Sequence, residues 1–228
     1  MKHMFGSITA LNQDSTAGAT APRTEGGAGP VMSGLVSGTS VATAMGWRPV
    51  EAVVAGDRVL TFDAGLQAVT QVTRHPFWQE AGPCPECFWP LEVPEGALGN
   101  REVMHLLPQQ TIMVESDTAE DLYGDPFSLI PAEAMDELTE SHRVPPQDGF
   151  EVVRLHFATE QVVFARNGLL FLCPSSRDMV TAVWDAPQDP LYAILPLDEA
   201  RFLATRIAAE AAEAAGAETE GCMAGLPA

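Results

Sequence analysis

The stretch that decides the fold of this chain is Gly34-Leu-Val-Ser-Gly-Thr-Ser-Val-Ala-Thr43, followed by Gly46-Trp-Arg-Pro-Val-Glu51, Gly56-Asp57 and Val59-Leu-Thr-Phe-Asp63. Short runs of valine, leucine and threonine alternate here with glycine, proline and aspartate. Short apolar or alternating runs bounded by turn-forming residues are typical of β-strands joined by tight turns. Because the pattern continues to about Ser176, the sequence predicts a mostly β domain.

The spacing of the expected strands argues for a compact barrel or sandwich rather than a parallel α/β sheet. The short connection Ala158-Thr-Glu160 predicts a hairpin between the strands on either side of it, and Asn167-Gly168 predicts a second tight turn. The predicted strands are Ser40–Ala44, Arg58–Phe62, Gln67–Arg74, Phe88–Val93, Thr111–Glu115, Glu151–Phe157, Gln161–Ala165 and Leu169–Cys173.

Helical signals are fewer and lie toward the carboxyl end. Residues 131–138 are expected to form a short helix with Pro131 in its first turn. A longer helix is expected over 198–216, capped by Asp198 and stopped by Gly216. Its apolar face would pack on the domain through Leu203, Ile207, Ala211 and Ala214.

The expected organisation has four parts. Residues 1–30 are rich in Gly, Ala, Ser and Thr without helical or strand periodicity, which favours a flexible amino-terminal arm. A β domain over 31–197 follows, and then the helix over 198–216. Residues 217–228 are expected to form a flexible tail.

The charge balance excludes several classes of partner. With 12 Lys plus Arg against 31 Asp plus Glu, the 228-residue chain carries a formal net charge of −19, which repels nucleic acid and anionic membranes. No run approaches the roughly 18 apolar residues of a membrane span, and residues 1–30 lack the apolar core of a signal peptide. We therefore expect no membrane insertion, and a protein that is cytoplasmic or secreted without a recognisable signal peptide.

The opening stretch resembles that of Hedgehog/intein (Hint) self-processing domains, particularly a bacterial branch whose first strand reads roughly Cys-Phe-x-x-Gly-Thr-x-Ile-x-Thr. Trp89-Pro-Leu-Glu-Val-Pro-Glu-Gly-Ala-Leu-Gly-Asn100 is similar to a later segment of that branch, Pro-Val-x-Ile-x-x-Gly-Ala-Leu-Gly-Asn. The likeness runs from about Val31 to Phe202. It implies the compact all-β Hint fold, to which the expected carboxyl-terminal helix is added.

Three polar positions of the family pattern are changed in this chain. The resemblance places the nucleophilic cysteine on Gly34. In Leu107-Pro-Gln-Gln-Thr-Ile-Met113, which stands in the place of Ser-Pro-x-His-Arg-Val-Leu, Gln110 replaces the histidine. Val153 to Leu170 is similar to Phe-x-x-His-Glu-x-Val-x-Ala-x-Gly-Leu and puts Glu160 where that histidine would lie.

These changes remove the groups that the family chemistry needs. Hint self-processing begins when a Cys or Ser attacks the preceding carbonyl, and a histidine transfers the proton. Gly34 offers no nucleophile, and the Gln110 amide does not titrate near neutral pH. Glu160 would then have nothing to activate. The resemblance therefore implies a catalytically inactive Hint-like domain without cofactors, which serves as a structural or protein-binding module.

The alternative is an active self-processing domain that uses a nearby hydroxyl. Ser33 lies one residue before the vacant position and would release the residues that precede it. Ser37 and Thr39 lie just beyond, where a hydroxyl more often stabilises a turn.

A cysteine pair and the acidic surface suggest two further kinds of contact. Cys84-Pro-Glu-Cys87 has the spacing of a zinc knuckle, but Cys173 and Cys222 form no second pair, so a zinc site and a disulfide or redox role are equally weak alternatives to two free thiols. A protein partner is expected to bind through the amino-terminal arm or the acidic surface.

Overall fold

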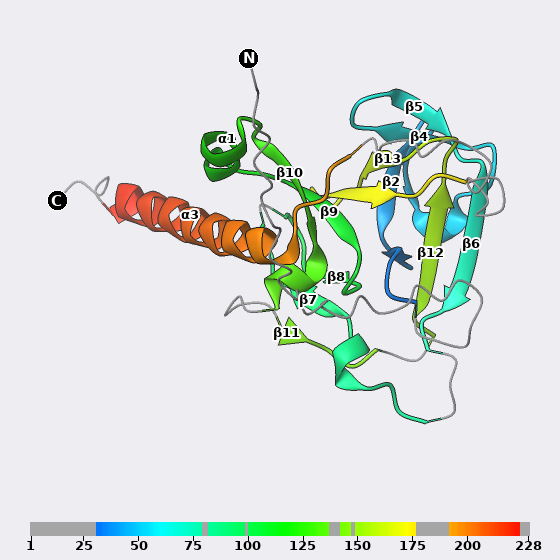
Figure 1. The fold of residues 1–228 in the computed structure, drawn as a ribbon, viewed down its shortest axis with the longest axis horizontal. Coiled ribbons are helices and arrows are strands. Elements are labelled where there is room, and N and C mark those ends of the chain that lie inside the picture. Colours follow the sequence, from blue (N-terminus) through cyan, green and yellow to red (C-terminus); the bar gives the residue numbers. More distant parts are fainter. Residues whose placement is uncertain are drawn as a thin grey trace, which may run out of the picture.

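The computed structural model describes residues 31–78, 82–98, 100–136, 142–146, 149–176 and 192–223, with the backbone alone for 211–223. The predicted arm over 1–30 lies outside these residues. In the described part of the chain the strands form three antiparallel sheets, and the long helix α3 extends from the β domain beside β10 and α1 (Figure 1). The prediction of a mostly β fold is confirmed.

The largest sheet is built in the order β10-β9-β14-β13-β4-β2-β3, with β5 paired to β4. One edge, β10, is bridged in parallel between Leu129 and Ile194, so the chain before α3 covers it. The strands are β2 Ser40–Thr43, β3 Gly46–Pro49, β4 Arg58–Thr61, β5 Gly65–Ala68, β9 Thr111–Glu115, β10 Phe127–Pro131, β13 Gln161–Phe164 and β14 Leu170–Cys173.

Two smaller sheets complete the domain. One has the order β1-β12-β6, in which Leu35 of β1 lies opposite Val153 of β12. The other has the order β11-β7-β8. Their strands are β1 Leu35–Val36, β6 Gln71–Pro76 and β12 Glu151–His156, and β7 Leu91–Val93, β8 Met104–Leu106 and β11 His142–Arg143. Three-residue 3₁₀ turns, η1 Val50–Ala52 and η2 Glu86–Phe88, lie between strands.

The predicted hairpin on either side of Ala158-Thr-Glu160 is wrong. β12 pairs with β1 and β6, whereas β13 pairs with β14 and β4, so the connection carries the chain from one sheet to another. The second predicted turn is confirmed, because β13 and β14 pair around Gly168, which adopts a φ of 95°. A φ in that range is one that glycine adopts without strain from a side chain.

The predicted strand over 67–74 is in fact two strands, β5 and β6. The chain changes partner at residues 69–70: Val69 exchanges backbone hydrogen bonds with Gly56 and Asp57, while the N–H of Thr70 donates to the carbonyl of His156. Alternation of apolar and polar residues indicates which side chains of a strand are buried, but it does not indicate which neighbouring strand it pairs with. Periodicity alone therefore does not locate this break.

Helix α1, Asp117–Tyr123, was not predicted. Ser116 caps it by accepting a hydrogen bond from the N–H of Ala119, and Gly124 ends it with a φ of 77°. Where a helix was expected over 131–138, Pro131 is the last residue of β10 and a 3₁₀ turn, η3, follows over Ala132–Met135.

Helix α3 spans Leu197–Met223. It buries Ala200, Leu203, Ala204 and Ile207 in the main core, which confirms the predicted apolar face at Leu203 and Ile207. Asp198 lies within the first turn of the helix instead of capping it. The helix continues through Gly216, so the predicted end of the helix is wrong. Residues 217–223, expected to begin a flexible tail, are helical. None of the described helices has the length and apolar character that crossing a bilayer requires.

Candidate functional site

The site begins at Gly34, the residue before β1. It is buried, and its φ of 131° lies in a region that residues with a side chain rarely adopt. Its backbone N–H donates a 2.7 Å hydrogen bond to Oε1 of Gln110. The structure therefore brings Gly34 and Gln110, two of the three positions singled out by the resemblance, into direct contact.

The Gln110 side chain, which is 2% exposed, links three strands through its amide group. While Oε1 accepts from Gly34 at the start of β1, Nε2 donates to the carbonyl of Thr111 in β9 at 2.7 Å and to that of Leu172 in β14 at 3.1 Å. Both ends of the amide are thus engaged with the backbone. A neutral amide in this arrangement holds strands together and moves no proton.

β12 occupies the space where a nucleophile's side chain would begin. A Cβ built on Gly34 would lie 2.5 Å from Cγ1 of Val152, 3.0 Å from Cγ of Arg154 and 3.2 Å from the carbonyl oxygen of Val153. Val152 is fully buried, and a β-branched side chain has few rotamers available to move aside. A cysteine or serine at position 34 therefore requires the Val152 side chain, or the strand that carries it, to shift.

Ser33 is held by the guanidinium group of Arg154. Nε of Arg154 donates to the Ser33 carbonyl at 2.8 Å, and Nη2 donates to Ser33 Oγ at 3.1 Å. The carbonyl that Ser33 would have to attack, that of Met32, accepts a 2.9 Å hydrogen bond from the N–H of Gln109. A guanidinium always carries its proton in proteins and cannot accept one from the serine.

The third position singled out by the resemblance, Glu160, forms no hydrogen bond or ion pair with Gly34 or Gln110 in the described structure. It lies just before β13 and near Tyr192, whose hydroxyl donates a 2.5 Å hydrogen bond to Asp63. Burial, the Asp63 carboxylate and then the charge of Glu160 together raise the pKa of the Tyr192 hydroxyl. Glu160 therefore belongs to a separate surface cluster.

The cysteine pair lies in the loop before β7. Cys84 is half-buried and Cys87 is exposed, and both are free thiols. Burial, followed by the neighbouring Cys87, raises the pKa of the Cys84 thiol. No group of three or more His, Cys, Asp or Glu side chains placed to hold a metal ion is found within the described residues.

Two contributors to the site, Val152 and Arg154, escaped the sequence analysis. Both lie in β12, about 120 positions after Gly34, and only the antiparallel pairing of β1 with β12 brings them alongside. An alternating strand pattern shows that Val152 is a candidate for burial, but it carries no information about the partner strand.

Comparison with known proteins identifies the family. The model of the Hint domain matches residues 33–171, more than half of the chain, and the chain belongs to this family. The expected Hint-like β fold with a carboxyl-terminal helix is confirmed.

Two solved structures are similar to this chain. A bacterial intein-like domain from Clostridium thermocellum shows 17% identity and a TM-score of 0.39, covering 62% of this chain and 99% of that domain. A GSH-linked, splice-inactive variant of the AceL NrdHF class 3 split intein shows 15% identity and a TM-score of 0.37, covering 63% of this chain and 99% of that one. No curated protein sequence matches.

Proposed function

We propose that this chain is a catalytically inactive Hint domain that serves as a structural or protein-binding module. The observation that carries the proposal is the 2.7 Å hydrogen bond from the Gly34 N–H to Oε1 of Gln110. At the two positions where the family resemblance places a nucleophile and a proton-transferring histidine, this chain has a backbone group and an amide that bind each other.

Position 34 lacks a nucleophile, and the packing around it also leaves no room for the side chain of one. The Val152 side chain lies where the first atom of a nucleophilic side chain would be, so β12 is packed for glycine at position 34. Acyl transfer requires a group that attacks the carbonyl and a base that takes its proton. In this site both roles are replaced by contacts that stabilise the fold.

Self-processing through Ser33 is the competing function. It would form an ester between Ser33 Oγ and the Met32 carbonyl carbon, with the amide nitrogen of Ser33 as the leaving group. The hydrogen bond from Arg154 to Ser33 Oγ argues against this route, because a guanidinium donor reduces the nucleophilicity of the oxygen instead of removing its proton.

The experiment that tests inactivity is the intact mass of the full chain after incubation with a thiol and, separately, with hydroxylamine. A thiol cleaves a thioester formed by an acyl shift, whereas hydroxylamine cleaves a thioester and also the ester that Ser33 would form. The proposal expects one species of 24.3 kDa in every condition. A fragment beginning at Ser33 or Gly34 would overturn it, and its loss in Ser33→Ala would assign the reaction to that serine.

A protein-binding role requires a partner, and the net charge of −19 favours a basic one. We propose that contact is made through the acidic surface or residues 1–30. The two routes are separated by comparing partner capture by the full chain with capture by a chain that begins at Val31. Capture that persists without residues 1–30 and weakens with salt supports the acidic surface.

A further inference from the structure

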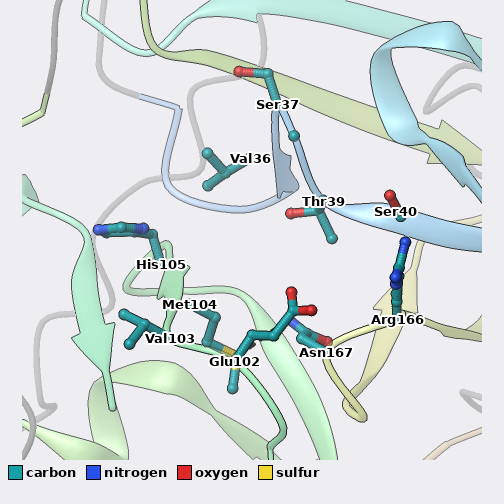
Figure 2. A pocket seen from close by; sticks show the side chains of 11 residues that line it. Val36, Ser37, Thr39, Ser40, Glu102, Val103, Met104, His105, Arg166 and Asn167 are labelled. Carbon is teal, nitrogen blue, oxygen red and sulfur yellow. Dashed lines mark hydrogen bonds between the residues drawn. The ribbon is translucent and has the colours of Figure 1, made fainter. Parts of the chain in front are cut away.

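A pocket of about 170 Å³ lies where segments from all three sheets come together. One wall is the loop over 36–40 that joins β1 to β2, and the opposite wall is the segment 102–105 that includes the start of β8. The third side is Arg166 and Asn167, in the turn between β13 and β14. Figure 2 shows Thr39 Oγ and the Glu102 carboxylate directed toward the space between these walls, with Arg166 flanking it beside Ser40.

Hydrogen bonds from backbone N–H groups hold the walls, and the charged side chains of Arg166 and Glu102 take no part in them. The N–H of Arg166 donates to the carbonyl of Ser40 at 2.8 Å, and the N–H of Arg101 donates to the carbonyl of Asn167 at 2.8 Å. Gly38 N–H donates to the Glu51 carboxylate at 2.9 Å. A pocket fixed in this way is largely formed before a ligand arrives, which lowers the entropic cost of binding.

Two side chains of opposite charge, Arg166 and Glu102, line this pocket without contacting each other. Arg166 and Glu102 form no ion pair with each other, and neither side chain has a hydrogen bond or ion pair with another described residue. The other polar walls differ: His105 Nε2 lies 3.2 Å from a Glu92 carboxylate oxygen, and the Asn167 amide is bonded to Met104 and to the Leu169 N–H. The pocket therefore offers one cation and one anion.

We propose that this pocket binds a small zwitterion of the amino-acid class, a molecule with one carboxylate and one ammonium group joined by a short carbon chain. The planar guanidinium of Arg166 matches a carboxylate in two parallel hydrogen bonds. The Glu102 carboxylate and Thr39 Oγ receive the ammonium, and Val36 and Met104 contact the carbon chain. This site goes beyond the module proposed above and does not depend on whether the chain cleaves itself.

The carboxylate requirement separates this site from general attraction of cations. A chain with a net charge of −19 concentrates any small cation near its surface. Arg166 adds a demand for an anionic group in the same molecule. A ligand with both charges is therefore expected to bind more tightly than one with either charge alone.

The test is a titration of the full chain followed through its amide signals by nuclear magnetic resonance. Glycine, β-alanine and γ-aminobutyrate supply the same two charges at increasing separation, while methylammonium and acetate each carry one. Because the pocket is open, we expect saturable binding with a Kd of about 1 mM for at least one zwitterion. The affected signals should be those of residues 37–40, 102–105 and 166–167. The single-charge probes should bind at least about tenfold more weakly.

Two variants and two matched controls assign the binding. Glu102→Gln and Arg166→Gln are each expected to weaken binding about tenfold, whereas Glu95→Gln and Arg206→Gln, at exposed positions that do not line the pocket, should leave it unchanged. The same spectra show whether each variant remains folded. If a variant unfolds, the comparison of glycine with methylammonium and with acetate on the unaltered chain decides alone.

Three outcomes would overturn the site. The first is the absence of saturable shifts with every zwitterion at concentrations of about 50 mM. The second is equal binding of zwitterions and of methylammonium, which would reduce the effect to the net charge. The third is saturable binding that survives both Glu102→Gln and Arg166→Gln in folded protein.

Discussion

The N–H of Gly34 donates a 2.7 Å hydrogen bond to the side-chain oxygen of Gln110, although 76 positions separate the two residues. Both atoms are buried, and the same Gln110 amide also binds carbonyls in β9 and β14. A buried polar contact of this kind fixes the strands that it joins, because leaving any of its groups without a partner is costly. It therefore ties the start of the domain to its largest sheet.

Replacing Gln110 by methionine should destabilise the domain. Methionine has a similar length but leaves the Gly34 N–H and the Thr111 and Leu172 carbonyls without this partner. We expect the free energy of unfolding to fall by about 2–4 kcal/mol, measured by urea denaturation. Gln109→Met is the matched control: its side chain is exposed, so a change within about 0.5 kcal/mol is expected. Equal stability of the two variants would show that the Gln110 contacts contribute little.

Adding a methyl group at position 34 should be costly for two reasons. Gly34→Ala must adopt a φ of 131° and place its Cβ 2.5 Å from Val152 Cγ1. We expect a loss of about 3 kcal/mol in the free energy of unfolding, from backbone strain and overpacking together. Gly46→Ala isolates the strain, because Gly46 has a φ of 95° and no heavy atom within 4 Å of its Cβ position. That control should lose about 1 kcal/mol.

A double-mutant cycle separates the steric part. Val152→Ala removes the atom that the new Cβ would meet, so Gly34→Ala should cost about 1–2 kcal/mol less in that background than in the unaltered chain. Additive effects of the two substitutions would mean that β12 moves aside freely, and that the close approach does not limit what position 34 can hold.

The cysteines should react with a thiol reagent in a fixed order. Cys87 is exposed and should react first, whereas burial raises the pKa of the Cys84 thiol and should slow its reaction. Burial raises the pKa of Cys173 to about 12, and this thiol should react only after unfolding. Timed labelling followed by peptide mapping, in a Cys222→Ser background, measures the order. Labelling of Cys173 in the native protein at the rate of Cys87 would contradict the described core.

Stability should decline in alkaline solution through Tyr192. Burial and the Asp63 carboxylate raise the pKa of its hydroxyl above the unfolded value of about 10, so the folded chain retains this proton longer than the unfolded chain. The resulting stabilisation is present in full below pH of about 10 and is lost as the pH rises further. In Tyr192→Phe, the free energy of unfolding should therefore decrease less steeply with pH in this alkaline range.

The measurement of Tyr192 is simplified by the composition, because the chain has two tyrosines. In Tyr123→Phe, the phenolate absorbance reports Tyr192 alone and should appear at a higher pH than in a free tyrosine. A normal titration would show that the 2.5 Å contact with Asp63 is absent in solution.

Much of the fold could be predicted from the sequence, because alternation and turn residues are local signals. The strand over 111–115 was located at both ends, and the turn at Gly168 was recognised from Asn167-Gly168. Helix α1 was missed although Ser116 and Gly124 are typical cap residues on either side of it. Gly216 did not end α3, because one glycine among alanines and glutamates costs a helix only about 1 kcal/mol.

The pairing of distant strands could not be predicted in the same way. Gly34 and Gln110 were each identified by resemblance, but nothing in their spacing indicates that one binds the other. The approach of Val152 to Gly34 depends on the pairing of β1 with β12, whereas the sequence predicts a hairpin of β12 with β13. A local sequence pattern determines which face of a strand is buried, whereas the partner depends on the topology of the whole domain.

The packing of Val152 against Gly34 also bears on the evolutionary history open to this chain. A single codon change that introduced a cysteine at position 34 would bring its Cβ within 2.5 Å of Cγ1 of Val152 and would meet Gln110 in place of a histidine. If the domain is inactive as proposed, such a change would lower stability without supplying a reaction. A working nucleophile at position 34 would therefore require coordinated changes at Gly34, Gln110 and Val152, which lie in three separate segments of the chain.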